Sequence, residues 1–173
     1  MNNCICLVGN PNVGKTTLFN ALTHSNEHVG NWHGVTVDAK QKSVLVDNVP
    51  YTVVDLPGTY SLSSFSYEEQ VAVDFLLNNN NKIINICDAN NLERNLYLTL
   101  QLLEADLDIS IAINFCNETK DKFDLDVYKL SQLLGVGVYK INPKNKKETK
   151  QKLLNSNTKV TNQTLPYLDN IAL

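Results

Sequence analysis

The sequence predicts an α/β fold in three layers, in which a mostly parallel sheet with one antiparallel edge strand is covered by helices on both faces. Two observations predict this class. Short apolar runs rich in β-branched residues alternate along the chain with segments of helical periodicity, which is the order expected of βαβ units. At Asp47-Asn48, two such runs follow each other across a pair of residues that favours a tight hairpin turn.

The first part of the chain is predicted to form a strand, a helix and a hairpin. Residues 5–8 are a continuous apolar run, typical of a parallel strand that is buried on both faces, and residues 17–22 follow as a helix. Residues 35–46 and 51–54 are the two arms of the hairpin. The hairpin therefore supplies the antiparallel strand at the edge of the sheet.

The rest of the chain continues the alternation and closes with a helix. In order, we expect a helix over residues 68–77, a strand over 82–87, a helix over 92–104, a strand over 109–113, a helix over 127–134, a strand over 136–141 and a closing helix over 144–155. Residues 156–173 have no clear period. We therefore assign residues 1–155 to one domain and residues 156–173 to a linker or to the start of a further domain.

Composition excludes several classes of function. The chain has 173 residues, the size of one globular domain, with 15 Lys and Arg against 18 Asp and Glu, which disfavours nucleic acid and anionic membranes as partners. No apolar run approaches the roughly 18 residues of a membrane span, and the N-terminal residues lack the features of a signal peptide. We therefore expect a cytosolic location. The four cysteines lack the spacing of a zinc site and are expected to be buried, reduced thiols.

The strongest functional signal is a phosphate-binding loop. The pattern G-x-x-x-x-G-K-S/T is matched at every fixed position by residues 9–16 (GNPNVGKT), between a predicted strand and a predicted helix. Glycines allow the backbone to approach a phosphate, Lys15 supplies a charge for the β and γ oxygens, and the Thr16 hydroxyl can bind Mg²⁺. This predicts a P-loop NTPase. The expected nucleotide contacts here are Gly9, Asn10, Pro11, Asn12, Val13, Gly14, Lys15, Thr16 and Thr17.

A second candidate segment, Asp55-Leu56-Pro57-Gly58, follows a predicted strand. This places a carboxylate at the carboxyl end of a parallel strand, where open α/β sheets bind ligands. Asp55 can hold a Mg²⁺-bound water, and the N–H of Gly58 can meet a γ-phosphate and release it when that phosphate is lost. The alternative is an ordinary Asp-x-Pro-Gly turn.

The irregular stretch 30–36 supplies a third candidate. We expect Gly34, Val35 and Thr36 to contact the nucleotide. The Thr36 hydroxyl would complete the Mg²⁺ shell only when a γ-phosphate orders the loop. A threonine at the edge of a strand is the alternative reading. Together the three segments describe a nucleotide-dependent switch.

Four segments together resemble the cytosolic G domain of the bacterial ferrous iron transport protein B family, over about residues 4–141. They are residues 9–16, residues 29–37 (VGNWHGVTV), residues 55–62 (DLPGTYSL) and residues 88–96 (DANNLERNL). The resemblance implies a Ras-like G domain that binds and hydrolyses GTP with Mg²⁺ and regulates Fe²⁺ uptake. It also implies a following helical domain and a membrane permease domain of the same parent protein, which would be located in the inner membrane and could form homo-oligomers.

The resemblance assigns a further role to Asn12. In K⁺-stimulated relatives an asparagine at this position helps to coordinate K⁺ beside the phosphates, together with backbone carbonyls that here would belong to Gly30 and Trp32. A monovalent cation can neutralise the charge that an arginine finger neutralises elsewhere. Thr59 stands in place of the glutamine of Ras-like enzymes, so slow intrinsic turnover is expected. The expected catalytic residues are Lys15, Asn12, Thr36 and Gly58.

The segments that read the base depart from the family. Where relatives have Asn-x-x-Asp, residues 114–117 are Asn114-Phe115-Cys116-Asn117, and where they have Ser-Ala, Asn142-Pro143 follows Ile141. An amide at position 117 opposes the guanine N2 amine, at an expected cost of about 2–4 kcal/mol, or roughly 30- to 1000-fold in affinity. The same amide would suit xanthine. The expected base contacts remain Asn114, Phe115, Asn117, Ile141, Asn142 and Pro143.

The sequence leaves two alternatives to a GTPase. The changes at Asn117 and Asn142-Pro143 favour a nucleotide-binding regulatory module with weakened guanine selectivity and little turnover, whereas the intact phosphate-side residues oppose it. A translation-associated GTPase of the Era-like group is disfavoured, because the chain shows neither an RNA-binding domain nor a basic balance of charge.

Overall fold

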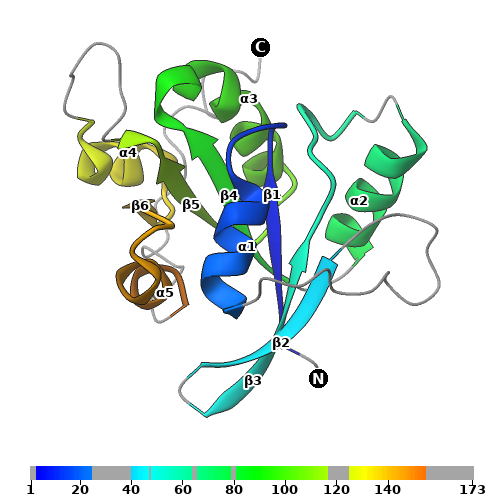
Figure 1. Ribbon diagram of the computed structural model, residues 1–173. Helices are drawn as coiled ribbons and strands as arrows, with labels where there is room; N and C mark the ends of the chain where they lie inside the picture. The colour runs from blue at the N-terminus through cyan, green and yellow to red at the C-terminus, as the bar shows by residue number, and fades with distance from the viewer. Residues whose placement is uncertain are drawn as a thin grey trace, which may run out of the picture.

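A mixed sheet of six strands, in the order β2-β3-β1-β4-β5-β6, forms the centre of the protein and carries helices on both faces (Figure 1). The computed structural model describes residues 3–24, 40–46, 48–63, 66–78, 81–116 and 125–154. The β2–β3 pair is antiparallel, and the other neighbouring strands pair in parallel. The predicted three-layer α/β class, with one antiparallel edge strand, is therefore confirmed.

The helices and strands follow the predicted order. They are β1 (Asn3–Gly9), α1 (Lys15–Thr23), β2 (Lys40–Val46), β3 (Val49–Asp55), α2 (Tyr67–Asn78), β4 (Lys82–Asp88), the short 3-10 helix η1 (Ala89–Asn91), α3 (Leu92–Glu104), β5 (Ile109–Asn114), α4 (Val127–Leu134), β6 (Val138–Lys140) and α5 (Lys146–Leu154). Helix α1 begins two residues before the predicted start. The prediction began late because the first two positions, Lys15 and Thr16, are polar and lie outside the apolar period. Strand β6 is shorter than predicted, and Ser131 Oγ donates to the Val136 carbonyl before it begins, at 2.6 Å.

The hairpin has a register that its turn determines. Val46 pairs with Val49, and the ladder continues to Lys40 opposite Asp55. Asn48 is left-handed, with φ 64°, as a tight turn between two twisted strands requires. The predicted start of the first arm, residues 35–39, lies outside the described residues. In Figure 1 the hairpin extends below the rest of the sheet.

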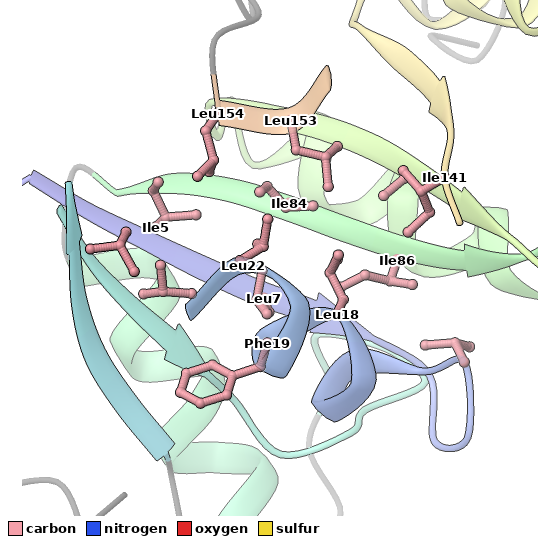
Figure 2. Packing of buried hydrophobic residues seen from close by; sticks show 14 residues of the cluster. Ile5, Leu7, Leu18, Phe19, Leu22, Ile84, Ile86, Ile141, Leu153 and Leu154 are labelled. Atoms are coloured by element: carbon pink, nitrogen blue, oxygen red, sulfur yellow. The ribbon is translucent and has the colours of Figure 1, made fainter. Parts of the chain in front are cut away.

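The core consists of apolar layers on both faces of the sheet. Along β1, Ile5 and Leu7 point to the face that α1 and α5 cover, while Cys6 and Val8 point to the face that α2 and α3 cover. Figure 2 shows the first layer, in which residues of α1 and α5 pack on strand residues. Burial on both faces explains why the strand sequences are continuously apolar.

The cysteines agree in part with the expectation of buried, reduced thiols. Cys4, Cys6, Cys87 and Cys116 are reduced. Cys6 and Cys87 are buried, and burial raises the pKa of the Cys87 thiol to about 12. Cys4 and Cys116 are only half-buried.

Among the described residues, no helix combines the length and the apolar character that crossing a membrane needs.

Candidate functional site

The phosphate loop joins the carboxyl end of β1 to α1 through three residues with positive φ. Gly9, Asn12 and Gly14 have φ values of 155°, 66° and 95°, which curl the backbone tightly. A Cβ on Gly9 would overlap the carbonyl oxygen of Ile86, and one on Gly14 would lie 2.5 Å from Nδ2 of Asn114. Both glycines are therefore required by packing as well as by backbone conformation.

The N-terminus of α1 has the features of an anion site. Gly14 is its N-cap and provides no side-chain cap, and no acidic residue lies in the first turn. The backbone N–H groups of this turn are therefore available, and the positive end of the helix dipole is not neutralised by a carboxylate. The loop and the helix end together fit a phosphate group.

A pocket of about 350 Å³ opens at this end of the sheet. It is lined by Asn12, Gly14, Lys15, Thr16, Thr17 and Phe115, all of which were predicted to contact nucleotide. Its volume lies in the range of roughly 300–1,000 Å³ that is typical of small-ligand sites. Because it adjoins the carboxyl ends of β1 and β5, it lies where open α/β sheets bind ligands.

Thr16 and Asp55, both predicted Mg²⁺ ligands, lie side by side. The Thr16 hydroxyl donates to Oδ2 of Asp55 at 2.9 Å. The other carboxylate oxygen, Oδ1, is buried without a hydrogen-bond partner among the described residues. Hydroxyl and carboxylate oxygens are ligands that Mg²⁺ prefers. The pair therefore fits a Mg²⁺ ion, directly or through a bound water.

Burial and neighbouring charges act in opposite directions on the pKa values of Asp55 and Lys15. Burial raises the pKa of the Asp55 carboxyl, while the Thr16 hydrogen bond and the charges of Lys15 and Lys40 oppose the rise. Burial lowers the pKa of the Lys15 ammonium, and Asp55 opposes that fall. The site thus holds partly desolvated charges that a phosphate and a divalent cation would compensate.

Gly58 lies directly against the phosphate loop. A Cβ at this position would be 3.1 Å from Cα and N of Pro11 and 3.2 Å from Nζ of Lys15. The backbone on either side of it is bonded to β1, since the N–H of Leu56 donates to Leu7 and that of Thr59 to Gly9, both at 3.2 Å. Gly58, which follows Pro57, is therefore held beside the predicted phosphate loop, and its contact with a γ-phosphate stays a prediction.

The predicted base-reading segments are only partly described. Nδ2 of Asn114 donates to the Val13 carbonyl at 3.1 Å and so ties the end of β5 to the phosphate loop. Phe115 is left-handed, with φ 61°, and lines the pocket. Ile141 is hydrogen-bonded through its N–H to Ile113 of the neighbouring strand. Asn142 caps the turn through Pro143 by accepting the N–H of Lys144 at 3.1 Å.

Several predicted site residues lie outside the described part of the chain. They are Gly30, Trp32, Gly34, Val35, Thr36 and Asn117. The roles assigned to them in Mg²⁺, K⁺ and base binding remain predictions.

Lys40 is a site residue that the sequence interpretation missed. It stands opposite Asp55 in the hairpin register, and its charge opposes the rise in the carboxyl pKa. The signal was present, because a two-residue turn at Asp47-Asn48 already pairs positions 40 and 55.

Replacing Asp55 with asparagine is expected to stabilise the ligand-free chain at neutral pH. Because the folded-state pKa of Asp55 is raised, ionised Asp55 lowers the free energy of unfolding. This penalty is absent below the ordinary aspartate pKa of about 3.9 and grows as the pH rises through the folded pKa. Urea unfolding of both chains should therefore show equal stability well below a pH of about 3.9 and a more stable Asp55→Asn variant near pH 7. The quantity compared is the free energy of unfolding of the variant minus that of the parent chain. If this difference is smaller at pH 7 than at low pH, the electrostatic interpretation is contradicted.

The protein has a phosphate loop after β1 and an Asp-x-x-Gly segment that begins at the last residue of the adjacent β3. On a mixed sheet of this order, these two segments define the class of Ras-like P-loop G domains. The family model for Ferrous iron transport protein B matches residues 3–156. The chain therefore belongs to the ferrous iron transport protein B family, and the resemblance drawn from the sequence is confirmed.

Known proteins agree with this assignment. An Fe(2+) transporter FeoB from Staphylococcus aureus (strain MSSA476) is 47% identical over 150 residues, which are 86% of this chain and 22% of the relative. The chain thus spans about a fifth of that relative's length. The FeoB G domain of Methanococcus jannaschii superposes with a TM-score of 0.74 at 39% identity, covering 87% of this chain and 95% of that one. S. thermophilus NFeoB bound to GDP.AlF4- and K+ superposes with a TM-score of 0.73 at 43% identity, covering 94% of this chain and 65% of that one.

Proposed function

We propose that this chain is the GTP-binding and GTP-hydrolysing switch domain of a ferrous iron transporter, dependent on Mg²⁺ and stimulated by K⁺. The observation that carries the proposal is the contact of Thr16 with Asp55 at 2.9 Å, beside Lys15 and Gly58. Asp55 and Gly58 thus lie beside Thr16 and Lys15, which line the pocket, so that a phosphate-binding loop, a cation-binding pair and a glycine N–H are close together. The GDP.AlF4- and K+ complex of the S. thermophilus relative supports the same chemistry.

The reaction is the attack of water on the γ-phosphorus, which breaks the bond to the β–γ bridging oxygen and yields GDP and phosphate. Lys15 and the N-terminus of α1 hold the β and γ oxygens and stabilise the charge that develops on them. Thr16 and Asp55, completed by Thr36, would hold Mg²⁺, which would neutralise phosphate charge when bound. Gly58 donates its N–H to the γ-phosphate and is released when phosphate leaves.

K⁺ stimulation is assigned to Asn12. Asn12 lines the pocket and is a left-handed residue of the phosphate loop. With the carbonyls of Gly30 and Trp32, an amide oxygen at this place would hold a monovalent cation against the phosphates, in the position of an arginine finger.

The setting of the domain follows from the family. We propose residues 1–155 as the G domain and residues 156–173 as a linker or the start of a helical domain. The domain would lie in the cytoplasm and couple its nucleotide state to an Fe²⁺ permease domain of the parent membrane protein, which could be a homo-oligomer. Guanine nucleotide is its proposed ligand.

A second candidate is a regulatory module that binds nucleotide with weak base selectivity and hardly turns it over. The amide at position 117 and the Asn142-Pro143 pair favour it. The complete phosphate side of the pocket opposes it.

Phosphate release from GTP tests the choice between the two. With Mg²⁺ present, replacing Na⁺ with K⁺ at equal ionic strength should raise the rate by about 10-fold or more. Chelating Mg²⁺ should abolish the activity, and Asn12→Ala should remove the difference between the two salts while leaving GDP binding in place. If bound GTP is released unhydrolysed in both salts, the switch enzyme is wrong and the module is favoured.

A further inference from the structure

Buried polar contacts attach helix α3 to strand β4. The backbone N–H of Asp88 donates to Oδ1 of Asn95 at 2.9 Å, and Nδ2 of Asn95 donates to the Asn91 carbonyl at 2.9 Å. One turn further along, Nδ2 of Asn85 donates to the Thr99 hydroxyl at 2.6 Å. Asn95 and Thr99 are 4% and 0% exposed. Because these groups are buried and directional, they resist sliding or rotation of α3 on the sheet.

A different face of α3 holds the segment that follows Gly58. The N–H of Leu62 donates to Oε1 of Gln101 at 2.8 Å. The guanidinium of Arg94 lies 4.4 Å from the centroid of the Tyr60 ring, within the range of a cation–π interaction. Arg94 and Gln101 are seven positions apart, about two helical turns, so they share one face of the helix.

The other end of this segment is bonded to the phosphate loop. Thr59 is 1% exposed, its N–H donates to the Gly9 carbonyl at 3.2 Å, and its hydroxyl donates to the Ser61 carbonyl at 2.7 Å. Gly58 itself lies against Pro11 and beside the Lys15 ammonium. The four residues 59–62 therefore connect the phosphate side of the pocket to α3.

We propose that Gln101 and Arg94 are positioning residues for the nucleotide switch, which hold residues 59–62 on α3 so that Gly58 stays beside Lys15. This rests on the proposed function, in which the Gly58 N–H meets the γ-phosphate. A segment that is already ordered loses less conformational freedom when the γ-phosphate binds. Asn85, Asp88, Asn91, Asn95 and Thr99 do not line the pocket, and their hydrogen bonds lock the helix that carries the two positioning side chains.

The test compares binding of a non-hydrolysable GTP analogue with binding of GDP, by calorimetry on the whole chain with Mg²⁺. Gln101→Met keeps the length of the side chain and removes the acceptor. It should weaken analogue binding by about 3- to 10-fold, the scale of one hydrogen bond, and change GDP binding by less than about 2-fold, because GDP has no γ-phosphate for Gly58. The Leu62 amide should exchange faster with solvent by a similar factor.

Two controls separate positioning from a general structural effect. Gln101→Glu keeps an acceptor oxygen and should restore the analogue-to-GDP affinity ratio. Gln132→Met makes the same exchange on an exposed position of α4 and should leave the ratio unchanged. An unchanged ratio in Gln101→Met, or an equal loss for both nucleotides, overturns the proposal. If the parent chain binds the analogue but does not hydrolyse GTP, the enzymatic function fails, and the ratio still decides the role of Gln101.

Discussion

Replacing Lys15 with methionine should weaken binding of a GTP analogue by about 10²- to 10⁴-fold, the largest effect expected of any single change. Lys15 is half-buried, its ammonium interacts with the charge of Asp55, and it is assigned to the β and γ oxygens. Each hydrogen bond to a charged group contributes about 1.5–3 kcal/mol, and tenfold in affinity corresponds to about 1.4 kcal/mol. GDP offers only the β contact, so its binding should weaken by about 10- to 100-fold.

The matched control for this prediction is Lys129→Met. Lys129 is exposed on α4, so removing its charge there should leave both affinities within about 2-fold. Calorimetric titration of the two variants and the parent chain provides the comparison. Equal affinities for the analogue in Lys15→Met and the parent chain would remove Lys15 from the phosphate site.

Replacing Asn117 with aspartate should raise GDP affinity by about 30- to 1000-fold. A carboxylate accepts from both N1–H and the N2 amine of guanine, whereas the native amide presents its own NH₂ to that amine. Xanthosine diphosphate should instead bind more tightly to the parent chain than to the variant, because position 2 of xanthine carries an acceptor. Competition of GDP and xanthosine diphosphate for the parent chain and the variant measures this.

Asn114→Asp gives an informative contrast, since it makes the same chemical change three residues earlier. Nδ2 of Asn114 donates to the Val13 carbonyl, so a carboxylate there would face a carbonyl oxygen and loosen the phosphate loop. Binding of GDP and xanthosine diphosphate should both become weaker. If Asn117→Asp leaves the GDP-to-xanthosine preference unchanged, the base is read by another group and the argument from the amide fails.

The sequence could predict the parts of the structure that local pattern controls. The phosphate loop is predicted by eight consecutive residues in which each glycine and the lysine meets a physical requirement. The positive φ angles of Gly9 and Gly14 agree with this prediction. The hairpin register follows from the turn at Asp47-Asn48, which even places Lys40 opposite Asp55. Continuous apolar runs correctly predicted strands buried on both faces.

Contacts between distant segments could not be predicted in this way. Leu62 and Gln101 are 39 positions apart, and Val13 and Asn114 are 101 apart. Gln101 resembles any polar residue on a helix surface until packing brings a backbone N–H to it. The start of β6 at Val138, two residues later than predicted, is likewise a detail that hydrophobic periodicity does not contain.

Amide hydrogen exchange at Gly58 and Thr59 tests the central claim most directly, because it reads whether the segment after β3 senses the γ-phosphate. The chain would be saturated with Mg²⁺ and either GDP or a non-hydrolysable GTP analogue. We expect the Gly58 amide to exchange at least about 10-fold more slowly with the analogue, since its N–H then donates to the γ-phosphate, while Thr59, already bonded to Gly9, changes little. Equal exchange of Gly58 in the two complexes would contradict a nucleotide switch at this site.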